Sequence, residues 1–125
     1  MKILLIGLGG FIGSVARFYT SKWTNLLFPS KIPFGTVVVN VAGSFIIGFL
    51  MVMAVEKLVV NEDIRLFIGV GVLGGFTTFS TFSVETMYLL EEGSFVPALI
   101  YIGCNLFLSL LAAYGGMLIA RSIIS

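Results

Sequence analysis

Residues 74–85 read Gly-Gly-Phe-Thr-Thr-Phe-Ser-Thr-Phe-Ser-Val-Glu and gather hydroxyls, a carboxylate and phenyl rings within a strongly apolar chain. Residues 66–84 carry no charge, so much of this segment can lie inside a bilayer. Polar groups at that depth are costly and usually face a partner helix or a permeation path. A phenyl ring is positive at its edge, so ring edges and hydroxyls together can replace part of the hydration shell of a small anion.

Helical spacing groups these side chains. Phe79 and Phe82 lie three residues apart and share one face, and Ser80 and Ser83 share the adjacent face. A pair of phenylalanines is more often simple packing, so ion contact and packing both remain open. Gly74-Gly75 predicts a break in this helix, because glycine weakens helices and frees their carbonyls.

Two further apolar runs contain polar side chains. Asn40 lies in residues 32–55, where its amide offers both donors and an acceptor. A hydrogen bond holding two helices together, typically under about 2 kcal/mol, is the simpler reading of this residue. Tyr101, Asn105 and Ser109 follow at four-residue spacing in the last run and predict a polar stripe on one helical face.

The composition restricts the chain to one class of protein. Of its 125 residues 58% are hydrophobic and 10% are charged, with a mean hydropathy of +1.14. Soluble domains are about 25% charged, so we expect an all-α integral membrane protein. The charge-free runs predict a single transmembrane domain, residues 1–125, with helices at about 2–22, 33–57, 63–91 and 95–122. A signal peptide over the first segment is the alternative.

Other functions lack the residues that they require. The chain has no histidine, no nucleophile beside a base and no cofactor motif, so we do not expect an enzyme. Cys104 is the single cysteine and is expected to pack as a small residue. The formal net charge of +1, without a long basic run, predicts no nucleic-acid partner.

The basic residues give almost no orientation signal. With four spans, the side that holds both termini carries four Lys and Arg residues and the other side carries three. Insertion both ways round, which permits an antiparallel dimer, and a single orientation set by other factors both remain open.

Small residues four apart recur along the helices, for example Gly9 with Gly13 and Ala112 with Gly116. Such pairs let membrane helices approach closely, which leaves little room for an aqueous path within one copy. A conduction path would then lie between subunits; a compact bundle with a structural role is the alternative.

Three motifs in order make the chain similar to the Fluc, or CrcB-type, family of fluoride channels. The first helix carries a glycine-pair-to-arginine motif over residues 9–18, and the second carries Pro-Phe-Gly-Thr-Val-Val-Val-Asn-Val-Ala-Gly-Ser-Phe over residues 33–45. The third is the segment of residues 74–83 followed by Glu85. The resemblance runs the length of the chain.

This resemblance implies passive export of fluoride from the cytoplasm through the plasma (inner) membrane of a microbe. It implies a dual-topology, antiparallel homodimer in membrane lipid, with two narrow pores, each lined by both subunits. It also implies a structural sodium ion held by backbone carbonyls at Gly74 and Thr77. Arg17 would lie near the vestibule and Glu85 at the pore edge. The implied fluoride pathway comprises Asn40, Phe79, Phe82, Ser80, Ser83, Tyr101, Asn105 and Ser109.

Two other functions compete with this expectation. A small multidrug exporter also has four short helices, but it needs a carboxylate in its first helix, and the first acidic residue here is Glu56. A non-transporting subunit of a larger assembly would conduct no ion at all. Fluoride efflux from vesicles separates the channel from both.

Overall fold

The computed structural model describes residues 1–123 and consists of helices joined by short connections. Four helical segments are long and apolar enough to cross a membrane: Lys2–Leu27, Phe34–Glu56, Glu62–Glu91 and Phe95–Ile123. The prediction of an all-helical membrane protein with four spans is therefore confirmed. The first helix continues to Leu27, beyond the predicted end at residue 22.

Only the first span is α-helical throughout, as α1 (Lys2–Leu27). The second consists of α2 (Phe34–Met51) and the π-helical turn η1 (Val52–Glu56). The third contains α3 (Glu62–Ile64), the π-helical η2 (Arg65–Leu73), α4 (Gly74–Phe76) and α5 (Ser80–Glu91). The fourth is α6 (Phe95–Gly103), π-helical η3 (Cys104–Leu108) and α7 (Ser109–Ile123).

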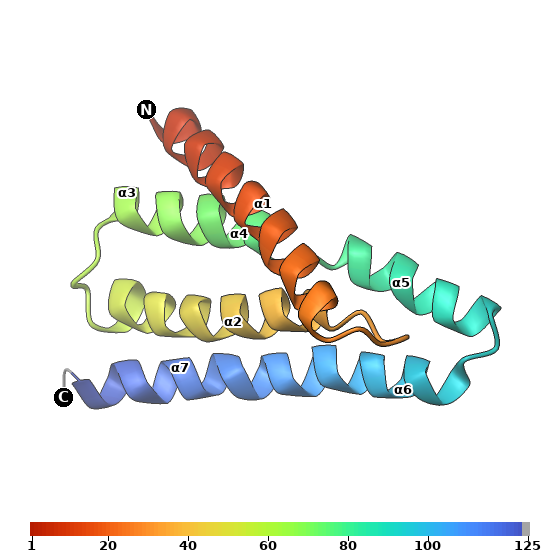
Figure 1. Cartoon of the computed structure of the whole chain (residues 1–125). Helices are drawn as coiled ribbons and strands as arrows, with labels where there is room; N and C mark the ends of the chain where they lie inside the picture. The colour runs from red at the N-terminus through yellow and green to blue at the C-terminus, as the bar shows by residue number, and fades with distance from the viewer. Residues whose placement is uncertain (124–125) are drawn as a thin grey trace.

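The second and fourth spans run side by side, and the first and third spans lie on one side of this pair (Figure 1). Helix α2 runs alongside α7, the helix with which it makes its most extensive contact. The segment from α3 to α4 lies on the other side of α2, α1 crosses it obliquely, and α5 continues past the start of α2 to pack on α6. Both termini lie at the same end of the bundle, as an even number of crossings requires.

Glycines allow these helices to approach one another. A Cβ added at Gly48 would collide with the backbone carbonyl of Ala113, and one added at Gly116 would collide with that of Phe45. Both contacts lie between α2 and α7. Close approach of backbones through small residues is how helices associate in lipid, where apolar side chains gain nothing by leaving the solvent.

Two small buried clusters hold the ends of the bundle together. One contains Val37, Leu89, Ala98 and Tyr101, which join α2, α5 and α6. The other, at the end that holds the termini, contains Val52, Met53 and Ala120. Large apolar side chains remain exposed along most helices, for example Phe11 on α1, which is 70% exposed. A lipid environment or a second chain can cover such a surface without the cost that water would impose.

The third span departs from helical geometry after its glycine pair, not at it. Gly74 and Gly75 are both part of α4, and the non-helical residues are 77–79, with Thr77 at φ −85° and ψ 160°. Both the backbone N–H and the hydroxyl of Thr77 donate to the Leu73 carbonyl, each at 3.0 Å. The next N–H, that of Thr78, bonds to the side chain of Asn40 on α2. The interruption thus begins two residues after the glycine pair near which a break is predicted, and a neighbouring helix supports it.

Candidate functional site

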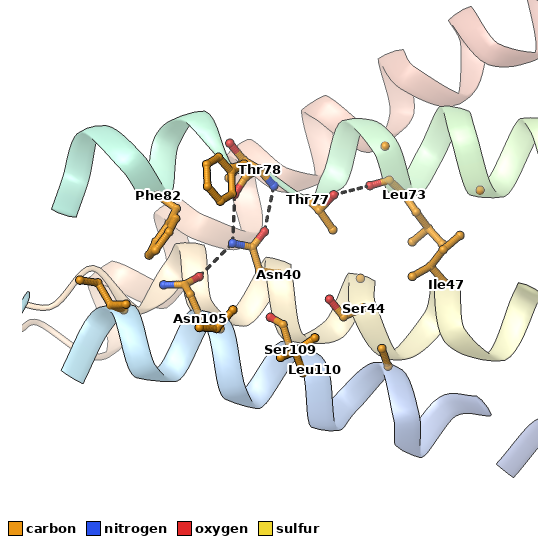
Figure 2. Close-up of a pocket in the computed structure, with 17 residues that line it drawn as sticks. Asn40, Ser44, Ile47, Leu73, Thr77, Thr78, Phe82, Asn105, Ser109 and Leu110 are labelled. Carbon is orange, nitrogen blue, oxygen red and sulfur yellow. Dashed lines mark hydrogen bonds between the residues drawn. The ribbon is translucent and has the colours of Figure 1, made fainter. Parts of the chain in front are cut away.

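A groove of about 730 Å³ runs between α2, the interrupted third span and the fourth span (Figure 2). Its wall is mostly apolar, and no charged side chain lines it within residues 1–123. The electrostatics of the groove therefore come from neutral dipoles and ring edges. The lining residues are Asn40, Gly43, Ser44, Ile47, Gly69, Leu73, Gly74, Thr77, Thr78, Phe79, Phe82, Ile102, Asn105, Leu106, Ser109, Leu110 and Ala113.

Asn40 connects the three sides of this groove through its side-chain amide. Its Nδ2 donates to the Thr78 carbonyl at 3.0 Å and to Oδ1 of Asn105 at 2.9 Å. Its own Oδ1 accepts the backbone N–H of Thr78 at 2.8 Å. Figure 2 shows Asn40 between the non-helical segment of the third span and the fourth span. The residue predicted as helix glue or ion contact thus fastens the non-helical segment to α2.

Asn105 lies in the π-helical turn η3, and its side chain reaches into the groove while the residue is only 6% exposed. Its Nδ2 donates to the Tyr101 carbonyl at 3.0 Å. Single π-helical turns within α-helices frequently occur at functional sites, and this one presents an amide to Asn40.

Tyr101 itself does not line the groove, although it belongs to the predicted polar stripe. Its ring is fully buried in the cluster with Val37 and Leu89, and its hydroxyl donates to Oε1 of Glu85 at 2.7 Å. Thr36 on α2 donates to the same oxygen at 2.5 Å. Tyr101 is therefore linked to the groove through its backbone carbonyl, which accepts from Asn105, and through its ring, which packs against Phe82.

Two phenyl rings flank the polar centre. The ring centroids of Phe79 and Phe82 are 5.5 Å apart with an interplanar angle of 63°, so the rings meet edge to face. Phe82 also lies 5.5 Å from the ring of Tyr101, at 44°. Both phenylalanines line the groove, as their shared helical face predicted, although Phe79 precedes the first residue of α5. Their edges can offer positive potential where the polar groups end.

The serines of the prediction divide into two groups. Ser109 lines the groove, and its buried hydroxyl has no hydrogen-bond partner among residues 1–123. Ser83 donates to the Phe79 carbonyl at 2.9 Å, and Ser80 is exposed. Neither Ser80 nor Ser83 lines the groove of the single chain.

A second, smaller cavity of about 330 Å³ lies beside the first. Arg17 from α1 and Glu85 from α5 both line it, which brings together the two charged residues predicted at a vestibule or pore edge. Thr78 lines both cavities and so lies at the boundary between them. The remaining lining residues are Phe18, Ser21, Lys22, Asn25, Thr36 and Thr81.

The sequence interpretation missed two residues of this network, Thr36 and Thr78. Thr36 precedes Asn40 by four residues on α2, so helical spacing alone would have placed both on one face. Thr78 contributes its backbone N–H and carbonyl, and no side-chain pattern signals such a role. Gly74 and Thr77, predicted to hold a cation through their carbonyls, both line the larger groove.

Four apolar spans, with an uncharged groove between three of them, define a multi-pass membrane protein with a candidate site between its spans. The family model described as CrcB-like protein, Camphor Resistance (CrcB), matches residues 4–117. The chain belongs to this CrcB-like family. The family resemblance drawn from the helix motifs is confirmed, and so is the prediction of a multi-pass protein in a microbial plasma membrane.

Curated relatives match along almost their whole length. A protein of Thermosipho melanesiensis is 45% identical over 122 residues, which cover 97% of both chains. One of Thermotoga maritima is 46% identical, covering 97% of this chain and 95% of its own. One of Sulfurihydrogenibium sp. is 41% identical, covering 96% and 97%. Each of the three is named a fluoride-specific ion channel, FluC.

Proposed function

We propose that this protein is a fluoride-specific ion channel through which cytoplasmic fluoride leaves a microbial cell passively. The relatives that match over nearly the full chain carry that function in their names, and a channel is not an enzyme. The observation that carries the proposal is the groove itself, where amides, a hydroxyl and ring edges meet without any charged side chain among the described residues.

This set of groups suits a small, strongly hydrated anion. The Ser109 hydroxyl can donate in place of water, and the edges of Phe79 and Phe82 can supply further positive potential. Asn40 adds an amide N–H group. Conduction requires binding strong enough to admit an ion and weak enough to release it. Because no Lys or Arg among residues 1–123 lines the groove, the anion would not be trapped by a full positive charge.

A second copy would complete the pathway. The groove is open on one chain, and Phe79 is 77% exposed beside it. Two copies inserted in opposite directions would each cover the groove of the other and enclose two separate pores. The nearly equal Lys and Arg count on the two sides of the chain favours such dual insertion. Ser80, exposed on the single chain, would act only toward that partner.

The same interruption of the third span suits a structural sodium ion. Because the N–H of Thr78 bonds to Asn40 Oδ1, the Gly74 carbonyl four residues earlier is not occupied by that N–H. Backbone carbonyls are hard oxygen ligands that replace the hydration of monovalent cations. Carbonyls at Gly74 and Thr77 from two copies would hold the ion at the dimer centre. The negative oxygen ends of these carbonyl dipoles would stabilise its positive charge.

Efflux from vesicles tests the proposal directly. Purified protein is reconstituted into liposomes loaded with potassium fluoride, and an electrode records the fluoride released when valinomycin balances the charge. We expect release far above that of protein-free vesicles, and none when chloride replaces fluoride and a chloride electrode is used. Fluoride release at the protein-free rate would overturn the function. Cross-linking that found every copy facing the same way would overturn the antiparallel dimer alone.

A further inference from the structure

The side chain of Asn105 is held in one orientation by bonds at both ends of its amide. Oδ1 accepts from Asn40 Nδ2 at 2.9 Å, and Nδ2 donates to the Tyr101 carbonyl at 3.0 Å. Turning the amide over would bring two N–H groups face to face at Asn40 and two oxygens together at Tyr101. Figure 2 shows the oxygen on the side of Asn40 and the nitrogen on the side of Phe82.

Asn40 has no N–H to spare in this arrangement. An asparagine amide carries two N–H donors, and those of Asn40 go to the Thr78 carbonyl and to Asn105 Oδ1. The bond to the Thr78 carbonyl is one of a reciprocal pair, because Asn40 Oδ1 accepts the Thr78 N–H. The bond to Asn105 stands alone. An anion that accepts a hydrogen bond from Asn40 therefore replaces Asn105 Oδ1 as the acceptor, because breaking that single bond costs less than breaking the reciprocal pair with Thr78.

We propose that Asn105 competes with the permeating anion for the second N–H of Asn40 and thereby sets how tightly fluoride is held at this depth. The inference rests on the proposed function. Asn105 is a positioning residue in this scheme, since it acts through Asn40. Without fluoride, Asn105 Oδ1 accepts the hydrogen bond from Asn40 Nδ2. When fluoride leaves, this hydrogen bond forms again, and its formation favours release of the ion over trapping.

Direct donation by Asn105 makes the opposite prediction. One hydrogen on its Nδ2 has no acceptor among residues 1–123, so that N–H is the other group able to contact the anion. Removing the amide would then weaken fluoride binding. Under competition, removing the amide leaves the Asn40 N–H without a partner in a largely apolar groove, so fluoride binding strengthens.

Asn105→Leu separates the two schemes, because leucine keeps the branched shape of asparagine and has neither donor nor acceptor. Initial fluoride efflux is measured against internal fluoride concentration for the wild type and the variant. We expect the half-saturating concentration to fall about fivefold, the ratio that one neutral hydrogen bond corresponds to. A rise would overturn the inference in favour of direct donation, and an unchanged value would overturn it outright. Absence of efflux from the wild type would instead overturn the proposed function, and this inference with it.

A spectroscopic titration keeps the test independent of the flux rate. The chain has four asparagines, so ¹⁵N-asparagine labelling gives few side-chain signals, which single substitutions assign. We expect the Asn40 Nδ2 signal to shift with sodium fluoride and not with sodium chloride, at about fivefold lower concentration in Asn105→Leu. Asn61, whose Oδ1 caps α3 through the Ile64 N–H, is the reference signal. Asn61→Leu is the control variant for the flux assay. An Asn40 signal that fluoride leaves unmoved in both proteins, with wild-type efflux intact, would overturn the inference.

Discussion

Asn40 takes the place of a helical hydrogen-bond partner for Thr78, to which it is bonded twice. Asn40 Oδ1 accepts the Thr78 N–H at 2.8 Å, and Asn40 Nδ2 donates to the Thr78 carbonyl at 3.0 Å. An interrupted backbone at membrane depth is tolerated only where protein or water satisfies its polar groups. One side chain of α2 thus stabilises the interruption of the third span and, in the proposed function, also presents an N–H to the anion.

We predict that Asn40→Asp suppresses fluoride efflux. Aspartate keeps the acceptor for the Thr78 N–H but loses both N–H groups, so it faces the Thr78 carbonyl and Asn105 Oδ1 with oxygen alone. An ionised carboxylate would also repel the anion. We expect efflux to fall at least tenfold in the liposome assay, and stability to fall by about 1–3 kcal/mol.

Gel filtration in detergent provides the control for this variant, because loss of folding would also abolish efflux. Normal conduction in a correctly assembled Asn40→Asp protein would contradict direct contact between Asn40 and fluoride.

We predict that Phe82→Ile slows fluoride efflux by more than tenfold without dissociating the protein. Isoleucine keeps an apolar volume but removes the ring that meets Phe79 edge to face at 5.5 Å. Phe95→Ile is the matched control, since Phe95 lies on α6, is 63% exposed and does not line the groove. Equal efflux from the two variants would show that the ring of Phe82 is not required.

Much of the site could be predicted because its residues stand out from an apolar background. Asn40, Phe79, Phe82, Asn105 and Ser109 stand out by type and spacing, and all line one groove. Polar residues are so costly inside a membrane span that each one is informative. The number of spans followed from the same composition.

The remaining differences arise from contacts between distant parts of the chain. The interrupted backbone at residues 77–79 bonds through Thr78 to Asn40, 38 positions away in the chain, and local glycine content does not record that contact. A new helix, α5, begins at Ser80. The face of this helix that carries Ser80 and Ser83 does not line the groove. The π-helical turn η3 likewise lies between Tyr101 and Ser109, so a stripe drawn at strict four-residue spacing does not stay on one face.

We predict that Glu85→Gln still conducts fluoride, at a rate reduced severalfold. Glutamine keeps an oxygen that can accept from Tyr101 and Thr36, the two hydroxyls that bond to Glu85 Oε1. It removes the carboxyl group that, in an exporter, would release a proton in exchange for a cation. Efflux is measured with and without a pH gradient across the vesicle. Complete loss in the variant, together with proton-dependent flux in the wild type, would favour an exporter.

We predict that Gly116→Ala destabilises the bundle and that Gly115→Ala does not. A Cβ at Gly116 meets the Phe45 carbonyl on α2, whereas a Cβ at the adjacent Gly115 has no neighbour within 4 Å among the described residues. Overpacking against backbone costs about 1–3 kcal/mol, because neither α2 nor α7 can move without disturbing the other contacts along their length. Thermal aggregation in detergent measures the difference, with the Gly116 variant expected to aggregate at lower temperature. Equal midpoints would show that α2 and α7 pack less closely at this glycine than the structure has them.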